Sequence, residues 1–229
     1  MKKLGIIGGL GPLATAHFLR LVTQLTRAEK DQDHIGIVMF SRPAIPDRTA
    51  FILGESTDSP EGDLVLLAVA LERAGAEMIA IPCFTAFHFY AAMQRAVDIP
   101  IIDPIEESVR ILKAQGIQAA GIMATDGALG GRLYQDRLAA AGIRAILPDA
   151  PGQKTVMDII YKGIKKGGTV DMDAFGAVAA SLRAAGAETI LLACSELSLV
   201  YPDGAPPGYV DVLAVLARSA VRDCGESDL

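Results

Sequence analysis

Short apolar runs alternate with longer, partly polar segments in the first half of the chain. The apolar runs have the length of strands, and their unbroken hydrophobicity is typical of strands buried on both faces of a parallel sheet. Strands are predicted at residues 3–9, 34–40, 77–82 and 99–102. Helices are predicted at residues 12–28, 61–74 and 85–97 and in a segment that ends near residue 116. Residues 41–59 are predicted to be a long loop of the kind that often binds ligands.

The same pattern restarts at residue 118. Strands are predicted at residues 118–124, 143–147, 189–193 and 208–211. Helices are predicted at residues 129–141, about 155–166, 172–185 and up to about 223. The pattern predicts an α/β fold with two pseudo-symmetric lobes, each with a central parallel sheet flanked by helices, and an active site in the cleft between them. We place the first lobe at 1–105 and the second at 106–210, with a C-terminal helix at about 211–223 that can pack back on the first lobe.

An internal repeat relates the two halves. Residues 71–83 read LERAGAEMIAIPC and residues 182–194 read LRAAGAETILLAC, so seven of thirteen positions are identical at an offset of 111. In each copy a helix ends at a glycine, Gly75 or Gly186, where a left-handed residue is needed, and a buried strand then ends in cysteine. The carboxyl end of a parallel strand is where open α/β sheets bind ligands, and a following helix N-terminus lowers the pKa of a thiol.

Two thiols at equivalent strand ends are predicted to face one ligand from opposite sides, and this arrangement suits the inversion of a stereocentre. One thiolate removes the α-proton while the other group, as a thiol, supplies a proton to the opposite face. An unperturbed thiol has a pKa of about 8.5, which is already near neutrality. We therefore predict that Cys83 and Cys194 are catalytic and that neither a cofactor nor a metal is needed. The carbanion requires N–H donors or a cation at the substrate carboxylate.

Composition and charge exclude several other classes. The net charge of -6 gives no support for nucleic-acid binding, and no apolar run approaches the length that spans a membrane. Three cysteines without metal-ligand spacing argue against a disulfide framework or a structural zinc site. Glycines and prolines between residues 5 and 12 interrupt the apolar N-terminus, which argues against a secretory signal. We expect a cytoplasmic homodimer whose partner is a small-molecule carboxylate or amino acid.

Three further features carry weaker signals. Residues 9–14 fit a loose dinucleotide fingerprint, but no carboxylate follows the second strand, so we expect these glycines to let backbone N–H groups face a carboxylate instead. Arg48, taken alone, is interpreted as a solvated surface arginine. Among Lys162, Lys165 and Lys166, at least two are expected only to complement a helix C-terminus.

Four ordered motifs together resemble successive signatures of the cofactor-independent aspartate/glutamate racemase family, over nearly the whole chain. They are GGLGPLAT at 8–15, IPDRT at 45–49, IPC at 81–83 with Thr85, and CSEL at 194–197. The resemblance implies that Cys83 and Cys194 are the two catalytic bases. It also implies that Arg48, together with Lys165, binds the distal carboxylate of a dicarboxylic amino acid. Residues expected to hold the α-carboxylate or otherwise line the substrate site are Gly11, Phe84, Thr85, Thr125 and Ser195.

One departure from the family leaves the substrate open. Where the family usually reads CNTAH, this chain reads CFTAF, so phenyl rings at Phe84 and Phe87 replace an amide and an imidazole. His88 lies one residue beyond the lost imidazole and is not expected to replace it. Either Phe84 packs as core while backbone N–H groups bind the substrate, or the pocket admits a less polar substrate or turns over poorly.

The leading hypothesis is a racemase of an acidic or related amino acid. The alternatives are another carbon-acid enzyme of the superfamily, such as a hydantoin racemase or maleate isomerase, and a non-catalytic metabolite-binding protein. A dithiol redox role is disfavoured because the cysteines of the repeat are 111 residues apart and no C-x-x-C pair exists.

Overall fold

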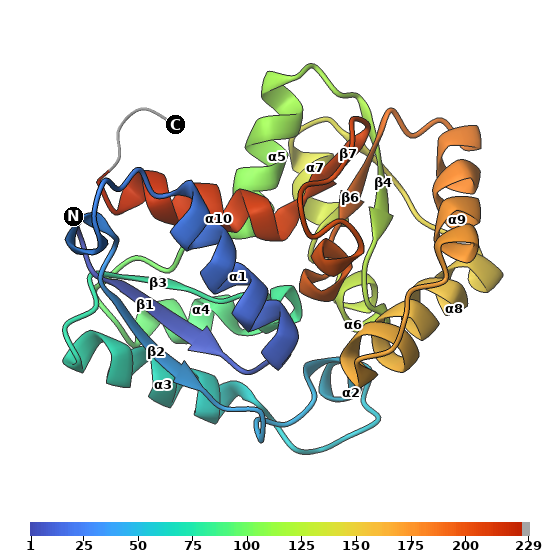
Figure 1. Cartoon of the computed structure of the whole chain (residues 1–229). Coiled ribbons are helices and arrows are strands. Elements are labelled where there is room, and N and C mark those ends of the chain that lie inside the picture. The colour runs from blue at the N-terminus through green and yellow to red at the C-terminus, as the bar shows by residue number, and fades with distance from the viewer. Residues whose placement is uncertain (226–229) are drawn as a thin grey trace.

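A computed structural model describes residues 1–225 and contains two parallel sheets, each flanked by helices (Figure 1). The first sheet has the strand order β2-β1-β3, formed by β1 (Leu4–Gly8), β2 (Ile37–Ser41) and β3 (Met78–Ala80). The second has the order β5-β4-β6-β7, formed by β4 (Ala119–Met123), β5 (Arg144–Ile146), β6 (Thr189–Leu192) and β7 (Tyr209–Asp211). Every strand pair is parallel. The predicted α/β fold class is confirmed.

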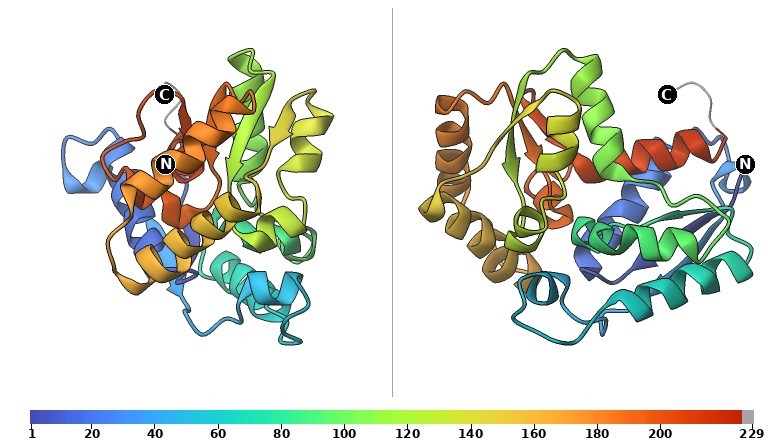
Figure 2. Two further views of the ribbon diagram at one scale, coloured as in Figure 1. Left: turned by 90° about the vertical axis from the view of Figure 1, so that its right-hand side faces the viewer. Right: turned by 180° about the vertical axis from the view of Figure 1, so that it is seen from behind.

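Helices connect the strands, and Figure 2 shows them around both sheets from the side and from behind. The α-helices are α1 (Pro12–Leu25), α2 (Arg48–Ile52), α3 (Glu61–Arg73), α4 (Tyr90–Arg95), α5 (Pro104–Ala114), α6 (Asp126–Gly130), α7 (Gln135–Ala140), α8 (Ala150–Asp158), α9 (Met172–Ala184) and α10 (Val212–Asp223). Short 3₁₀ helices are η1 (Asp31–Asp33), η2 (Phe84–Phe89), η4 (Ile164–Lys166) and η5 (Ser195–Val200), and η3 (Ile159–Gly163) is a π turn. No helix among residues 1–225 is long and apolar enough to cross a membrane.

The sequence repeat corresponds to two equivalent pieces of structure, α3 with β3 and α9 with β6. Gly75 and Gly186 end the two helices with φ angles of 83° and 96°, the left-handed conformation that the sequence predicts. β3 and β6 are buried over their whole length and pair with β1 and β4, respectively. Each strand leads through a cysteine into a short 3₁₀ helix, η2 or η5, so the two thiols occupy equivalent places in the two sheets.

The strand predicted at 99–102 is reduced to a single bridge between Ile79 and Ile101. Pro100 has no N–H to donate to a ladder, and the N–H of Ile99 instead donates to the Glu72 side chain at 3.1 Å. Ile79 N donates to the Pro100 carbonyl and Ile102 N to the Ile79 carbonyl, both at 2.9 Å. This segment therefore lies beside β3 as β7 lies beside β6, but its ladder is one pair long.

Other predictions of local structure are wrong in part, and the helix predicted at 85–97 begins as the 3₁₀ helix η2 before it continues as α4. The loop predicted at 41–59 contains the short helix α2, because the Asp47 side chain accepts a hydrogen bond from Ala50 N at 2.9 Å and caps it. The helix predicted at 129–141 is split into α6 and α7. Arg132 has a φ of 53° directly after two glycines, which ends the first helix before the second begins.

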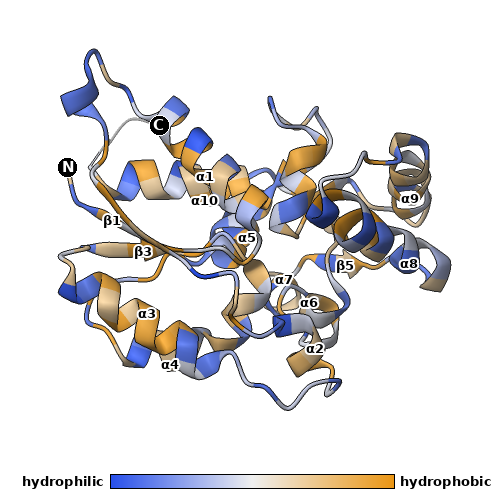
Figure 3. Ribbon diagram, turned by 60° about the horizontal axis from the view of Figure 1, so that its bottom comes forward, coloured by the Kyte–Doolittle hydropathy of each residue, from blue (hydrophilic) through white to orange (hydrophobic). Residues whose placement is uncertain are grey.

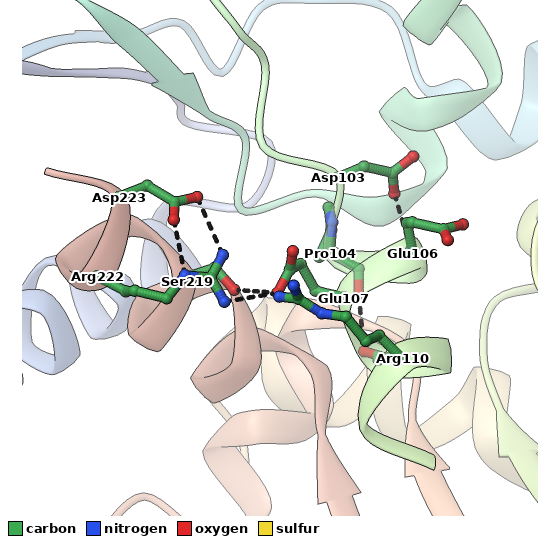
Figure 4. Close-up of polar contacts among 9 residues, drawn as sticks. Asp103, Pro104, Glu106, Glu107, Arg110, Ser219, Arg222 and Asp223 are labelled. Carbon is green, nitrogen blue, oxygen red and sulfur yellow. Dashed lines mark hydrogen bonds and ion pairs between the residues drawn. The ribbon is translucent and has the colours of Figure 1, made fainter. Parts of the chain in front are cut away.

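The helices that follow the two sheets lie across the middle of the molecule. α10 packs against α1 and α5, and α5 also contacts α7. Figure 4 shows Glu107 of α5 accepting hydrogen bonds from Ser219 at 3.0 Å and Arg222 at 3.1 Å, both on α10. Thus α10, although it follows the second sheet, packs on the first helix of the chain. The division into lobes at residues 105 and 106 stays a prediction.

One large apolar core extends through both sheets. Ile7 of β1, Ile122 of β4 and Leu213 of α10 are fully buried members of it. Figure 3 shows β1 as a mainly hydrophobic strand, while α1 and α10 carry polar as well as hydrophobic residues. A second cluster lies among β6, α8 and α9. The shared core holds the carboxyl ends of β3 and β6 in fixed positions, and both catalytic candidates follow these ends.

Candidate functional site

Cys83 and Cys194 line the same small cavity. Both thiols are buried, with 4% and 7% of each residue exposed. The cavity has a volume of about 10 Å³, which is room for about one water molecule. Its lining contains every predicted site residue except Gly11, and consists of Leu10, Asp47, Arg48, Thr49, Cys83, Phe84, Thr85, Thr125, Tyr161, Lys165, Ala193, Cys194, Ser195 and Glu196. The structure thus brings together groups that are up to 186 positions apart in the sequence.

A larger outer cavity of about 380 Å³ adjoins this inner one, and Gly11 lines the outer cavity instead. Its size falls within the range of small-molecule sites. The residues common to both cavities are Leu10, Asp47, Arg48, Lys165 and Glu196. The outer cavity is therefore the approach to the thiols. Because the inner cavity holds only about one water molecule, an amino acid reaches both thiols only if the surrounding side chains or segments move apart.

Arg48 is buried, with 6% of the residue exposed, so its interpretation as a solvated surface arginine is wrong. Its guanidinium donates to the carbonyls of Pro46 and Leu10 at 3.0 Å and, at 3.3 Å, to that of Ile45. These carbonyls come from the loops after β1 and β2, so the two loops fix the position of the charge. Burial lowers the pKa of Arg48, but neighbouring Cys83 and Asp47 outweigh burial and raise it overall.

Cys83 therefore lies beside a permanent cation. Its Sγ is 3.4 Å from Thr85 Oγ1, within hydrogen-bonding distance for sulfur. Phe84 is 2% exposed and belongs to the core as well as to the cavity lining. Phe87 stacks on Tyr90 with ring centroids 5.9 Å apart, while His88 is exposed and absent from the lining of either cavity. Among residues 1–225, no imidazole lines either cavity in place of the one that the family motif contains.

Cys194 lies beside an anion. Its Sγ donates to Glu196 Oε2 at 3.0 Å, and Ser195 Oγ donates to the same oxygen at 3.1 Å. Burial and the charge and hydrogen bond of Glu196 raise the pKa of Cys194 well above its ordinary value of 9.0. The expected lowering of the thiol pKa by a helix N-terminus is therefore wrong for Cys194. The following 3₁₀ helix is six residues long, and a buried carboxylate outweighs its dipole.

Lys165 is the lysine of its segment that reaches the site. Its Nζ lies 3.8 Å from Glu196 Oε1 and 4.3 Å from the centre of the Tyr161 ring. Burial lowers the pKa of Lys165, but Glu196 and Tyr161 outweigh burial and raise it, so the ammonium stays charged. Lys162, in contrast, pairs with Asp158 at 2.7 Å on the surface.

Three ionisable residues of the inner cavity were not predicted as site residues: Asp47, Tyr161 and Glu196. Glu196 stands two places after Cys194 inside a recognised motif, so the spacing of a carboxylate next to a thiol was a usable signal. Asp47 precedes Arg48 and was recognised only as part of its motif. The OH of Tyr161 donates to Asp47 Oδ2 at 3.4 Å. Tyr161 lies in the π turn at Ile159–Gly163, and no motif in the sequence around it indicated that this turn brings its side chain to the site. Among residues 1–225, no cluster of three His, Cys, Asp or Glu side chains could hold a metal ion.

Known proteins resemble this chain in sequence and in fold. The family model described as Asp/Glu/Hydantoin racemase matches residues 7–220. The aspartate racemase of Picrophilus torridus has a similar structure, with a TM-score of 0.86, 27% identity, and coverage of 98% of this chain and 95% of that one. An aspartate racemase homologue from Pyrococcus horikoshii shares the fold, with a TM-score of 0.79 at 23% identity over 99% of this chain and 100% of that one.

A curated relative adds a sequence comparison. The broad specificity amino-acid racemase RacX of Bacillus subtilis is 28% identical over 152 residues. The matched region covers 64% of this chain and 64% of the length of that relative.

Proposed function

Because the chain belongs to the Asp/Glu/hydantoin racemase family, we propose that it is a cofactor-independent racemase of an acidic or related amino acid. The observation that carries the proposal is that Cys83 and Cys194 follow equivalent strands of two sheets and line one cavity. The aspartate racemase of Picrophilus torridus, similar over nearly its whole length, supports this reaction class. The Bacillus subtilis relative, a broad specificity amino-acid racemase, supports an amino acid as the substrate.

In the proposed reaction the two thiols exchange roles. The Cys83 thiolate takes the α-proton, breaking the C–H bond and forming S–H, while the Cys194 thiol gives its proton to the opposite face of the same carbon. Arg48 places a positive charge beside Cys83, and the raised pKa of Cys194 keeps that thiol protonated. We therefore propose that the resting enzyme acts directly on the enantiomer whose α-proton faces Cys83.

The carbanion needs positive charge and hydrogen-bond donors around the carboxylate. In this proposal Arg48 and Lys165 attract the distal carboxylate, and the hydroxyls of Thr85, Thr125 and Ser195 hold the α-carboxylate. Thr125 Oγ1 accepts from Ala128 N at 3.3 Å as the cap of α6, which leaves its own proton available for donation. The Ser195 proton is directed at Glu196 and would have to turn toward the substrate.

The proposal is tested by incubating the protein in D₂O with single enantiomers of aspartate, glutamate and a panel of neutral amino acids. Exchange of the α-proton is followed by NMR and inversion by optical rotation. We expect inversion accompanied by incorporation of deuterium for at least one acidic or related amino acid. Absence of both exchange and inversion for every amino acid would refute the racemase assignment. Activity confined to neutral amino acids would refute the proposal that the substrate is acidic but would leave the racemase assignment intact.

We further propose that the protein acts as a cytoplasmic homodimer. All three cysteines are free, as in a reducing compartment. Met39 and Phe40 on the edge strand β2 are each 37% exposed, and Leu13 beside the outer cavity is 50% exposed. Apolar side chains on a sheet edge are a common contact surface between copies. Sedimentation equilibrium should give twice the chain mass of 24.0 kDa, and a monomer at micromolar concentration would contradict the dimer.

A further inference from the structure

Glu196 carries a buried carboxylate oxygen that accepts no hydrogen bond from the residues that the structure describes. The residue is 3% exposed, and its Oε2 accepts from both Cys194 and Ser195. Its Oε1 has no hydrogen-bond donor within residues 1–225. The nearest cation, Lys165 Nζ, is 3.8 Å away and is too distant for a hydrogen bond. A buried anionic oxygen without a donor is costly, and a bound cationic group would remove that cost.

This free oxygen lies on the route to the thiols. Glu196 lines both the outer and the inner cavity, so a molecule that passes from one to the other contacts its side chain. Gly11, at the N-terminus of α1, makes room for Oε1 because it has no side chain. A Cβ on Gly11 would lie 2.6 Å from this oxygen. The φ of Gly11 is -116°, so the need for glycine here comes from the carboxylate and not from the backbone.

The other carboxylate of the site, Asp47, is fully engaged. Its Oδ1 accepts from Ala50 N at 2.9 Å as the cap of α2, and its Oδ2 accepts from Tyr161 OH at 3.4 Å. Of the two carboxylates that line both cavities, only Glu196 therefore has an oxygen with no hydrogen-bond donor in the described part of the chain.

We infer that Glu196 Oε1 binds the α-ammonium group of the substrate beside the thiol of Cys194. This inference rests on the proposed function and names the amine subsite of the same cavity. An ammonium group carries donors and a positive charge, whereas a hydantoin nitrogen is acylated and uncharged and maleate has no nitrogen. Glu196 therefore selects free amino acids over the other substrates of the superfamily that the sequence leaves open. The same charge offsets the effect of Glu196 on Cys194, so the thiol is easier to ionise when substrate is bound.

The test compares pairs of ligands that differ only in the amino group. Calorimetry measures the binding of aspartate and succinate, glutamate and glutarate, and alanine and propionate. The wild-type protein should bind at least one amino acid more tightly than its partner without the amine. Glu196→Gln should reduce that preference by at least about tenfold, the scale of a charge-assisted hydrogen bond, without weakening the binding of the partner. Glu196→Asp, which keeps the charge on a shorter side chain, should retain part of the preference.

Two variants serve as controls. Glu55→Gln removes an exposed carboxylate outside the site and should leave the preference unchanged. Asp47→Asn removes the other carboxylate of the site and should weaken the binding of an amino acid and of its analogue without the amine to the same extent. The inference is overturned if Glu196→Gln keeps the wild-type preference, if Asp47→Asn alone abolishes it, or if the wild type binds no amino acid more tightly than its partner.

Because binding is measured without turnover, this outcome is separable from that of the proposed function. Racemisation with an unchanged preference in Glu196→Gln would refute the amine subsite and leave the racemase assignment intact. If Glu196→Gln loses the preference for the amino acid but the wild-type protein racemises none, the amine subsite is supported and the racemase assignment is refuted.

Discussion

The repeat places the thiols of Cys83 and Cys194 at equivalent positions, but their neighbouring side chains carry opposite charges. Cys83 has the guanidinium of Arg48 beside it, whereas Cys194 donates to the carboxylate of Glu196 at 3.0 Å. A cation stabilises a thiolate and a carboxylate destabilises one. The two sides of the cavity therefore differ in the charge that lies beside each thiol, although both thiols serve the same proton transfer in the proposed reaction.

The pH dependence of thiol alkylation should report this difference. Burial and Glu196 raise the pKa of Cys194, so its thiolate forms only at strongly alkaline pH, and Glu196→Gln should shift iodoacetamide labelling of Cys194 to lower pH. Mass spectrometry of the labelled peptides measures the shift. Cys224, whose pKa burial and Asp223 raise to about 11, is the internal control and should be unaffected. Identical labelling profiles for Cys194 in both proteins would contradict the role of Glu196.

Gly11→Ala should reproduce part of the effect of removing Glu196. The added Cβ would lie 2.6 Å from Glu196 Oε1 and force the carboxylate to move, while the backbone accepts alanine without strain. We expect the free energy of unfolding to change by less than about 1 kcal/mol but kcat/KM for racemisation to fall by about tenfold or more. Urea unfolding and initial rates test the two parts. Unchanged kcat/KM would show that the position of this carboxylate is unimportant.

At the scale of elements, local signals in the sequence predict most of the framework. The alternation of apolar runs and helices, and the two glycines that end α3 and α9, depend on neighbouring residues and were predicted correctly. The features that were missed depend on packing between distant segments. The Tyr161 side chain reaches the site only through a π turn, and the single bridge at Ile101 follows from where the Ile99 N–H finds its acceptor.

Alanine substitutions at two glycines, one directly after the C-cap of α9 and one inside the helix, should change the stability in opposite directions. Gly186→Ala places a side chain at a φ of 96°, and its Cβ would lie 2.9 Å from an Arg144 nitrogen, so we expect a loss of about 1–2 kcal/mol of stability. Gly176 lies inside the same helix with open space around its Cβ, and Gly176→Ala should stabilise the protein by about 0.5–1 kcal/mol. Urea unfolding measures both. Effects of the same sign would contradict this account of the helix end.

At the scale of the whole molecule, α5 and α10 connect the two sheets. α10 packs on α1, and α5 contacts α7, where Arg137 pairs with Asp103. The order of helices along the sequence does not show that α10 packs on α1 or that α5 contacts α7. Each helix is amphipathic whichever sheet it covers, so its sequence does not identify its partner. The equivalence of the two thiols was predictable from the repeat. Their common cavity depends on how these helices orient one sheet against the other.

Glu107 on α5 should make the stability of the molecule depend on pH. Burial raises its pKa, but hydrogen bonds from Arg222, Ser219 and Arg110 outweigh burial and leave it below its ordinary value of 4.5. A lowered pKa stabilises the fold above about pH 4.5, and this contribution is lost as the pH falls through the folded-state pKa. Glu107→Gln should therefore lower the free energy of unfolding by about 1–2 kcal/mol at pH 7, and by less at acid pH.

Urea unfolding at pH 7 and in acid measures this difference. Glu106→Gln, which alters the neighbouring exposed carboxylate, is the matched control and should have little effect at either pH. A Glu107→Gln deficit that does not shrink as the pH falls would contradict the assignment.

The central claim is that inversion needs both thiols of one cavity. The most direct measurement follows single enantiomers of the converted amino acid in D₂O with Cys83→Ser and Cys194→Ser, by optical rotation and by NMR of the α-proton. Each variant should lose inversion by a factor of at least about 10², while one of them can still exchange the α-proton of one enantiomer without inverting it. Inversion at the wild-type rate in either variant would contradict the two-base account.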